Sequence, residues 1–157
     1  MGSQSKINLA YIAGFLDGDG SLMIQIKKRS ESKTGGVRFM LTICFYQDTR
    51  HEKPLFWIRD QLGIGYISRR NDGITELRIN GYKQVSDILK KLSPFIRFKK
   101  KQADTIISAA PILMKVVRSD KDKRKLVDKI LIVQSENYAT RRKRSKEELL
   151  KILGFTP

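Results

Sequence analysis

The sequence is poor in cysteine and histidine, and each shortage excludes a class of protein. Cys44 is the only cysteine and His51 the only histidine among 157 residues. A single thiol cannot form a disulfide framework, which predicts a reducing compartment. One cysteine and one histidine also cannot supply the four ligands of a zinc site within one chain. The shortage of histidine further disfavours nucleases whose metal or general base rests on that residue.

Acidic residues and long apolar runs are scarce as well. There are 16 Asp and Glu against 32 Lys and Arg, which gives a formal net charge of +16. This excess favours a polyanionic partner, with nucleic acid ahead of an anionic membrane surface. The longest apolar run, near residues 7–16, is far shorter than the ~20 residues that a membrane-spanning helix needs. It also lacks the start and cleavage site of a signal peptide. We therefore expect an intracellular protein with no membrane partner.

The pattern of apolar residues predicts an α+β fold. Residues 1–4 look like a tag remnant, and residues 5–157 are expected to form a single domain. Strict alternation predicts two strand pairs, 21–29 with 37–47 and 66–70 with 74–80. Helical signals occupy 9–16 after a cap at Asn8, then 54–63, 85–92, 99–110 before Pro111, 120–135 and 145–154. The order helix, hairpin, helix, hairpin, helices predicts a four-stranded antiparallel sheet with extra C-terminal helices.

One face of this sheet carries side chains that suit the edges of DNA bases. A two-stranded ribbon fits the major groove, where Arg reads guanine, Gln reads adenine and Met or Thr contacts the thymine methyl group. For either strand alone, an ordinary solvated face is the simpler interpretation. The same pattern on both hairpins of so basic a chain favours DNA binding. The expected contacts are Met23, Gln25, Lys27, Arg29, Arg38, Met40, Thr42, Cys44, Tyr46, Ser68, Arg70, Glu76 and Arg78.

Two basic runs are less informative. They are Lys99 to Lys101 and Arg141 to Arg144. Either run suits contact with phosphates, and either suits a solvated helix surface. The role of the second run stays open at this stage.

The stretch "YIAGFLDGDGSL", residues 11–22, leads a helix into two acids separated by one glycine. Small residues recur along this helix at i, i+3, i+4 and i+7, and small residues let two helices approach closely. With one copy of the stretch per chain, the simplest partner is the same helix of a second copy in a two-fold dimer. The expected interface residues are Ala10, Ala13, Gly14 and Asp17.

A dimer of this kind crowds carboxylates at its axis. Carboxylates that lie close together repel one another unless a cation compensates them or unless they are protonated. Carboxylate oxygens and glycine-exposed carbonyls suit Mg²⁺, which keeps water and phosphate among its ligands. The competing interpretation is an ordinary turn, since Asp-Gly pairs favour turns. A calcium-binding loop is excluded because Ser21 and Lys28 occupy positions that need ligands.

The segment Ile12-Ala13-Gly14-Phe15-Leu16-Asp17-Gly18-Asp19-Gly20 resembles the signature of the LAGLIDADG homing endonucleases. One copy of the motif in a chain of this length is similar to the single-motif, homodimeric branch. The resemblance extends over residues 7–110, through "GYI" before the second hairpin and "PFIRFKKKQA" after it. It implies an α-β-β-α-β-β-α core with a DNA-binding sheet.

The resemblance also implies roles for individual residues. Asp19 is the expected metal ligand, with the Gly18 carbonyl as an additional ligand, whereas Asp17 is more structural. Gln47 matches a position that organises metal-bound water, and Lys99 matches a basic residue near the scissile phosphate. Where the family often has another basic side chain, this sequence has His51. The expected cofactor is Mg²⁺, with Mn²⁺ as a substitute and Ca²⁺ binding without cleavage; no small-molecule cofactor is expected.

The sequence therefore predicts a homodimeric, site-specific endonuclease for double-stranded DNA. It would make a double-strand break in a long pseudo-palindromic site of roughly 20 base pairs, in the service of intron or intein homing. The alternative is a non-cleaving module of the same fold, either an RNA maturase or a DNA-binding regulator. The family resemblance makes a chloroplast, a mitochondrion or the archaeal cytoplasm the expected setting.

Overall fold

The computed structural model describes residues 5–29, 36–137 and 143–156. The first helix, α1 (Lys6–Asp19), begins at Ser5, whose hydroxyl accepts a hydrogen bond from the Asn8 amide at 3.1 Å. The cap predicted at Asn8 is therefore wrong, because the Asn8 side chain instead donates to Gln61 Oε1 at 2.9 Å. Residues 1–4, the expected tag remnant, lie outside the described residues.

The chain passes from α1 directly into the sheet. At Gly20 a Cβ atom would lie 2.6 Å from Leu16 Cδ1 and 2.8 Å from the Leu16 carbonyl oxygen, so this junction requires glycine. Strand β1 (Gly20–Lys28) then pairs antiparallel with β2 (Val37–Asp48), with Leu22 opposite Ile43. Both predicted strands are present; burial alternates along β1 as predicted, whereas residues 41–45 of β2 are all buried.

A short 3₁₀ turn, η1 (Thr49–His51), leads from β2 into α2 (Lys53–Leu62). Gly63 ends α2 with φ of 70°, a left-handed conformation that costs glycine little. The second hairpin, β3 (Tyr66–Arg69) and β4 (Ile74–Asn80), follows. The order of strands across the sheet is β1-β2-β4-β3, with every neighbouring pair antiparallel.

The remaining helices are α3 (Tyr82–Leu92), α4 (Lys100–Leu113), α5 (Asp120–Glu136) and α6 (Lys146–Ile152). Helix α4 continues past Pro111, so the end predicted before that residue is wrong. The proline lies in the last turn of the helix and is exposed, so the missing N–H and the ring affect only the final turn of α4. The box predicted from Ser145 and Glu148 is present, with both side chains capping α6.

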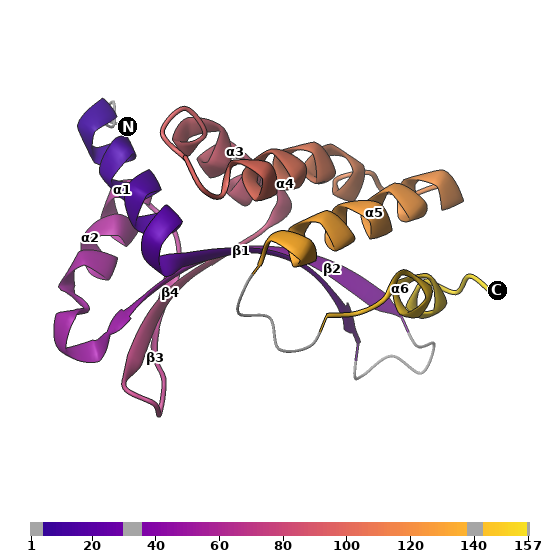
Figure 1. Cartoon of the computed structure of the whole chain (residues 1–157), viewed down its shortest axis with the longest axis horizontal. Helices are drawn as coiled ribbons and strands as arrows, with labels where there is room; N and C mark the ends of the chain where they lie inside the picture. Colours follow the sequence, from indigo (N-terminus) through magenta and orange to yellow (C-terminus); the bar gives the residue numbers. More distant parts are fainter. Residues whose placement is uncertain (1–4, 30–35, 138–142, 157) are drawn as a thin grey trace.

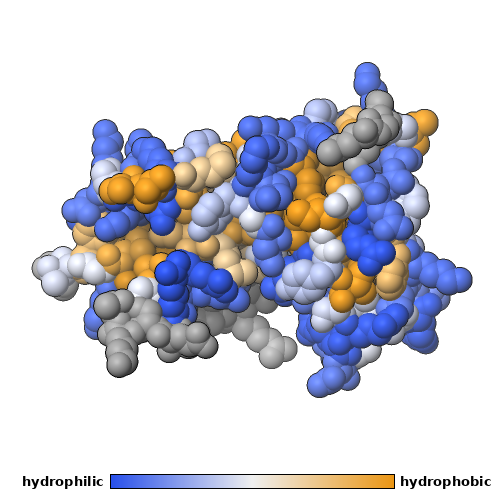
Figure 2. Space-filling view, turned by 180° about the vertical axis from the view of Figure 1, so that it is seen from behind, coloured by the Kyte–Doolittle hydropathy of each residue, from blue (hydrophilic) through white to orange (hydrophobic). Residues whose placement is uncertain are grey.

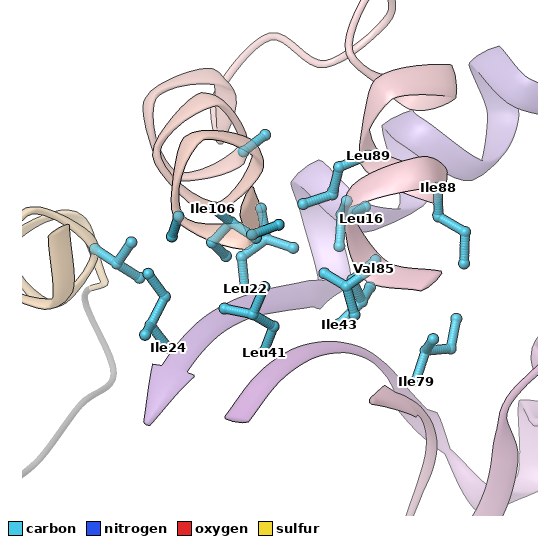
Figure 3. Packing of buried hydrophobic residues seen from close by; sticks show 14 of the residues in the cluster. Leu16, Leu22, Ile24, Leu41, Ile43, Ile79, Val85, Ile88, Leu89 and Ile106 are labelled. Atoms are coloured by element: carbon cyan, nitrogen blue, oxygen red, sulfur yellow. The ribbon is translucent and has the colours of Figure 1, made fainter. Parts of the chain in front are cut away.

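The core lies between the sheet and one layer of helices. Figure 1 shows α1, α3, α4 and α5 along one face of the curved sheet, while no helix of the described chain covers the opposite face. In Figure 3, apolar side chains from the strands, such as Leu22 and Ile43, point toward Leu16 in α1, Leu89 in α3 and Ile106 in α4. All five are fully buried. The α+β fold predicted from the sequence is confirmed.

Candidate active site and nucleic-acid interface

The two acids at the end of α1 have different environments. The Asp17 carboxylate accepts hydrogen bonds from the backbone amides of Arg97 (2.7 Å), Phe98 (3.2 Å) and Lys99 (3.0 Å). It therefore anchors the segment that leads into α4. The carboxylate of Asp17 is thus bonded within its own chain. In the predicted dimer interface, Asp17 would therefore not contribute a free charge.

Lys99 is held against the same end of α1. Its ammonium donates to the Asp17 carbonyl oxygen at 2.5 Å. Burial lowers the pKa of Lys99, and the negative charges of Asp17 and Asp19 oppose that shift. The side chain is thus a partly buried cation close to both acids, although 80 positions of chain separate Lys99 from Asp19.

Asp19 is the last residue of α1 and is exposed. The carbonyl groups at the end of a helix carry partial negative charge, and the Asp19 carboxylate adds to it, so this tip attracts cations. Among the described residues, no cluster of three or more His, Cys, Asp or Glu surrounds a metal position. One carboxylate and the exposed carbonyl of Gly18 still fit Mg²⁺, because that ion binds few protein ligands and retains water and phosphate.

Strand register brings Gln47 to the same end of the sheet. Gly20, the first residue of β1, pairs with Phe45, so Gln47 lies two residues beyond the start of β1, on the side of the helix tip. Its side-chain oxygen accepts from the Asp48 amide at 2.9 Å. His51 is exposed in the adjoining turn η1. The structure thus places Lys99 close to Asp19, and strand register puts Gln47 at the same end of the sheet.

The outer face of α1 differs from the prediction at one position. Ala13 is fully buried in its own chain, because it faces the core, and it cannot touch a second copy. Ala10 and Gly14 are exposed, and beside them Ile7 and Tyr11 are 80% and 52% exposed. Ala13 is therefore not part of the exposed face of α1, which Ile7, Ala10, Tyr11 and Gly14 form.

Packing among the described residues does not require the glycines of α1. A Cβ atom added at Gly14 or Gly18 would meet nothing within 4 Å. Glycine within a helix costs roughly 0.5–1 kcal/mol relative to alanine. No packing reason within the described chain explains that cost, whereas the close approach of another molecule to α1 would explain it.

The uncovered face of the sheet carries most of the predicted base-reading side chains. Cross-strand pairing places Gln25 beside Met40, and Lys27 beside Arg38. On β4, Arg78 donates to Glu76 at 3.0 Å, so a carboxylate orients this guanidinium. The remaining residues on this face, partly or fully exposed, are Met23, Arg29, Tyr46, Ser68 and Arg70.

Thr42 and Cys44 are corrections to the predicted interface. Both lie on central strand β2 and are fully buried, because neighbouring strands flank them on both sides. Thr42 donates to Asn80 Oδ1 at 2.7 Å, and burial raises the pKa of the Cys44 thiol. Alternation along one strand predicts correctly which face a side chain lies on. It does not predict whether longer side chains on neighbouring strands cover a short side chain on that face.

The prediction from sequence omitted three residues that lie on the same face of the sheet. Ser21 and the Tyr46 hydroxyl lie 3.0 Å apart, Tyr66 is 53% exposed, and Asn80 closes the row on β4. Each is in register with a predicted contact: Ser21 with Cys44, Tyr66 with Arg78, and Asn80 with Thr42. Extending the alternation to both ends of each strand would have found them.

Hydrophilic side chains cover much of the molecular face shown in Figure 2, with smaller apolar patches between them. In the part of the chain that the structure describes, every helix is too short or too polar to cross a lipid bilayer.

Comparison with known sequences places these features in a family. The sequence model of the LAGLIDADG endonuclease family matches residues 12–107. The chain is 30% identical over 156 residues to the DNA endonuclease I-CvuI of Chlorella vulgaris, which covers 95% of this chain and 93% of that protein. It is 32% identical over 105 residues to the DNA endonuclease I-CreI of Chlamydomonas reinhardtii, covering 66% of this chain and 62% of that protein.

Solved structures share the fold over nearly the whole chain. The homing endonuclease I-CvuI, crystallised with its target in the presence of Ca, matches with a TM-score of 0.79 and 26% identity over 97% of this chain and 98% of that chain. The archaeal intron-encoded homing endonuclease I-Vdi141I has the same fold, with a TM-score of 0.79 and 22% identity over 94% of each chain. The chain therefore belongs to the LAGLIDADG endonuclease family, and the enzyme class predicted from its nine-residue motif is confirmed.

Proposed function

We propose that two copies of this chain form a homodimer that cleaves both strands of duplex DNA within a long, nearly palindromic site. The observation that carries the proposal is the contact of Lys99 with the tip of α1, at the end of the uncovered basic sheet where Gln47 also lies. Similarity to the DNA endonucleases I-CvuI and I-CreI supports DNA as the substrate. Residues 5–157 act in this proposal as one domain, in keeping with a single buried cluster from Ile12 to Leu149.

Asp19 and the Gly18 carbonyl would hold Mg²⁺ at the tip of α1, with Mn²⁺ as a substitute. When bound beside a phosphodiester, such an ion supplies a nucleophilic water and stabilises the leaving oxygen. Structures of I-CvuI with DNA in the presence of Mg and of Ca support the use of a divalent metal. We expect Ca²⁺ to support binding to DNA without cleavage.

The surrounding side chains act on the phosphate and on the water. The ammonium of Lys99, fixed by the Asp17 carbonyl, would stabilise the negative charge that develops on the scissile phosphate. The amide of Gln47 would orient water at the tip of α1.

The dimer would form through the exposed stripe of α1. Ile7, Ala10, Tyr11 and Gly14 lie on that stripe, and the unused space at Gly14 and Gly18 supports close contact with a second helix. A two-fold axis along α1 brings both copies of Asp19 to the centre of the assembly. Each protomer would then cut one strand.

Each sheet would lie along one half-site in the major groove. Strand β1 of 9 residues at ~3.3 Å per residue covers roughly 30 Å, or about 9 base pairs. Two half-sites therefore make a target of about 20 base pairs. The proposed contacts are Met23, Gln25, Lys27, Arg29, Arg38, Met40, Tyr46, Ser68, Arg70, Glu76 and Arg78.

Selection of cleaved molecules from a randomised duplex library in Mg²⁺ tests the proposal. We expect recovered sites of about 20 base pairs with two-fold symmetry, and no recovery with Asp19→Asn, which should still bind the selected site. If the parent binds a site but never nicks it in Mg²⁺ or Mn²⁺, the protein is a non-cleaving DNA-binding regulator or RNA maturase instead. Binding to anionic liposomes that duplex DNA does not displace would contradict both.

A further inference from the structure

Strand β1 is an edge strand of the DNA-binding sheet, and two side chains from the C-terminal part of the chain cover its free edge. Asn137, just after α5, donates its amide N–H to the Leu22 carbonyl oxygen at 3.1 Å. Arg144, just before α6, donates its guanidinium Nη1–H to the Ile26 carbonyl oxygen at 3.1 Å. The two carbonyls are four residues apart on the side of β1 that faces away from β2.

Arg144 is held in place from both directions along the chain. Its backbone amide donates to Gln134 Oε1 at 3.2 Å, and its carbonyl accepts from Gln134 Nε2 at 3.2 Å. The next residue, Ser145, starts the capping box of α6. Leu149 in that helix is 1% exposed and anchors α6 in the core. The backbone of Arg144 is therefore fixed, and its guanidinium extends from it toward β1.

The inward side chains of β1, such as Leu22 and Ile24, are buried in the core, but its free backbone edge borders a groove. A groove of about 930 Å³ separates β1 from α5 and α6, and its lining includes Gln25, Lys27, Val133 and Leu149. Unpaired strand edges are mobile and prone to pairing with other chains unless something covers them. Across this groove, the bonds from Asn137 and Arg144 are the polar links to β1 that the described chain contains.

We propose that Asn137 and Arg144 are positioning residues that hold the edge of β1, so that Gln25 and Lys27 present a fixed geometry to DNA. Arg144 belongs to a basic run that also suits contact with phosphates, but its guanidinium is directed to the Ile26 carbonyl. The proposal rests on the proposed function for its effect on DNA binding. Its structural part, restraint of β1, concerns the free protein.

Hydrogen–deuterium exchange in the free protein tests that structural part. Gln25 and Lys27 direct their backbone groups toward β2, since alternate residues of a strand point to opposite sides. We expect Arg144→Ala and Asn137→Ala to speed exchange of these two amides by about tenfold or more while amides of β4 keep the parent rate. Lys143→Ala, which removes one charge from the adjacent exposed position, is the matched control and should leave β1 unchanged.

Salt dependence of DNA affinity separates a positioning role from a phosphate contact. Each lost phosphate contact reduces the slope of log K against log[salt] by about 0.9. We expect Arg144→Ala to keep the slope of the parent while its affinity falls about three- to tenfold at every salt concentration. Its affinity for a site altered at the bases that Gln25 and Lys27 contact should fall less, because discrimination at those bases depends on the position of β1.

A reduced slope with unchanged exchange in β1 would overturn the proposal and make Arg144 a phosphate ligand. Exchange in β1 that is equally slow in Arg144→Ala, Asn137→Ala and the parent would overturn it as well. These outcomes differ from failure of the proposed function, in which the parent itself shows no specific DNA binding. In that case the exchange experiment still decides whether the two residues restrain β1.

Discussion

Asp17 and Asp19 show how environment gives two identical side chains different tasks. The first carboxylate accepts three backbone hydrogen bonds from residues 97–99 and thereby places Lys99. The second is exposed at the tip of α1 and available to a cation. A distance of two residues along a helix corresponds to about 200° of rotation, so one side chain turns into the fold while the other turns away.

We predict that Asp17→Asn and Asp19→Asn separate stability from catalysis. An amide accepts hydrogen bonds less well than a carboxylate and brings N–H groups toward three donors. Asp17→Asn should therefore lower the free energy of unfolding by about 1–3 kcal/mol. Asp19→Asn should change it by less than about 0.5 kcal/mol and lower the rate of cleavage more than about 100-fold. Urea denaturation and single-turnover cleavage measure the two effects.

Equal loss of stability in the two variants would contradict the different environments assigned to Asp17 and Asp19. Asp104→Asn, which alters an exposed i, i+4 ion pair with Lys100 on α4, serves as a surface control for both measurements.

At the scale of elements, one carboxylate joins the turn after β2 to the second hairpin. Glu52 accepts from Arg69 Nε at 3.0 Å and from the Thr75 hydroxyl at 2.7 Å. Thr75 is fully buried and lies 2.9 Å, hydroxyl to hydroxyl, from Thr49 in η1. Gln47 pairs with Thr75 across the sheet. The end of β2 that carries Gln47 and the second hairpin, which we propose to contact DNA, are therefore connected by polar side chains.

This connection predicts a pH dependence. Hydrogen bonds from Arg69, and then from Thr75, lower the pKa of Glu52. A carboxyl whose pKa is lower in the folded state stabilises the fold above its unfolded pKa of about 4.3, and this contribution is lost as the pH falls through the folded pKa. We expect Glu52→Gln to be less stable than the parent at pH 7, with the difference shrinking below about pH 4.3.

Thermal denaturation of both proteins from neutral to acidic pH measures this difference. A gap in melting temperature that stays constant over the whole range would contradict the role of the Glu52 charge. Glu147→Gln, a change at an exposed residue in the first turn of α6, is a suitable control.

Strands were predictable because one face of each is buried. Alternation in β1 follows from burial of Leu22, Ile24 and Ile26, and the structure confirms it. Positions that depend on distant contacts were not predictable. Thr42 and Cys44 are covered by neighbouring strands, Asn8 bonds to Gln61 instead of capping α1, and Pro111 is tolerated because α4 ends just after it.

The acids at the end of α1 suggested a metal site by their chemistry, but Gln47 and Lys99 were predictable only through the family resemblance. Lys99 and Asp17 are 82 residues apart in the chain, and their contact depends on how α4 begins beside α1. No local periodicity encodes such a contact. The hydrogen bonds of Asn137 and Arg144 to β1 span more than 110 residues and were missed for the same reason.

At the scale of the whole molecule, the account depends on a second copy. One chain offers a single exposed carboxylate at the tip of α1 and a basic sheet long enough for one half-site. Its first helix carries glycines that its own fold does not use. Each of these features is half of an arrangement that a two-fold axis along α1 would complete.

We predict that Gly14→Leu blocks the dimer and leaves the protomer folded. A Cβ atom at this position meets nothing within 4 Å in the described chain, and replacing a helix glycine should raise the stability of an isolated protomer by up to about 1 kcal/mol. Sedimentation analysis should find a dimer for the parent and a monomer for the variant. Lys83→Leu, at an exposed position of α3, controls for added surface hydrophobicity. A Gly14→Leu protein that remains dimeric would contradict an interface along α1.

The most direct test of the account is cleavage by a mixed dimer. Co-expressing the parent with a differently tagged Asp19→Asn chain and purifying through both tags yields dimers with one intact Asp19. If each protomer cuts one strand, these dimers should convert a supercoiled plasmid that carries the target into nicked circles and stop there. Linear product at the rate of the parent, or no nicking at all, would contradict the division of the two cuts between two copies of Asp19.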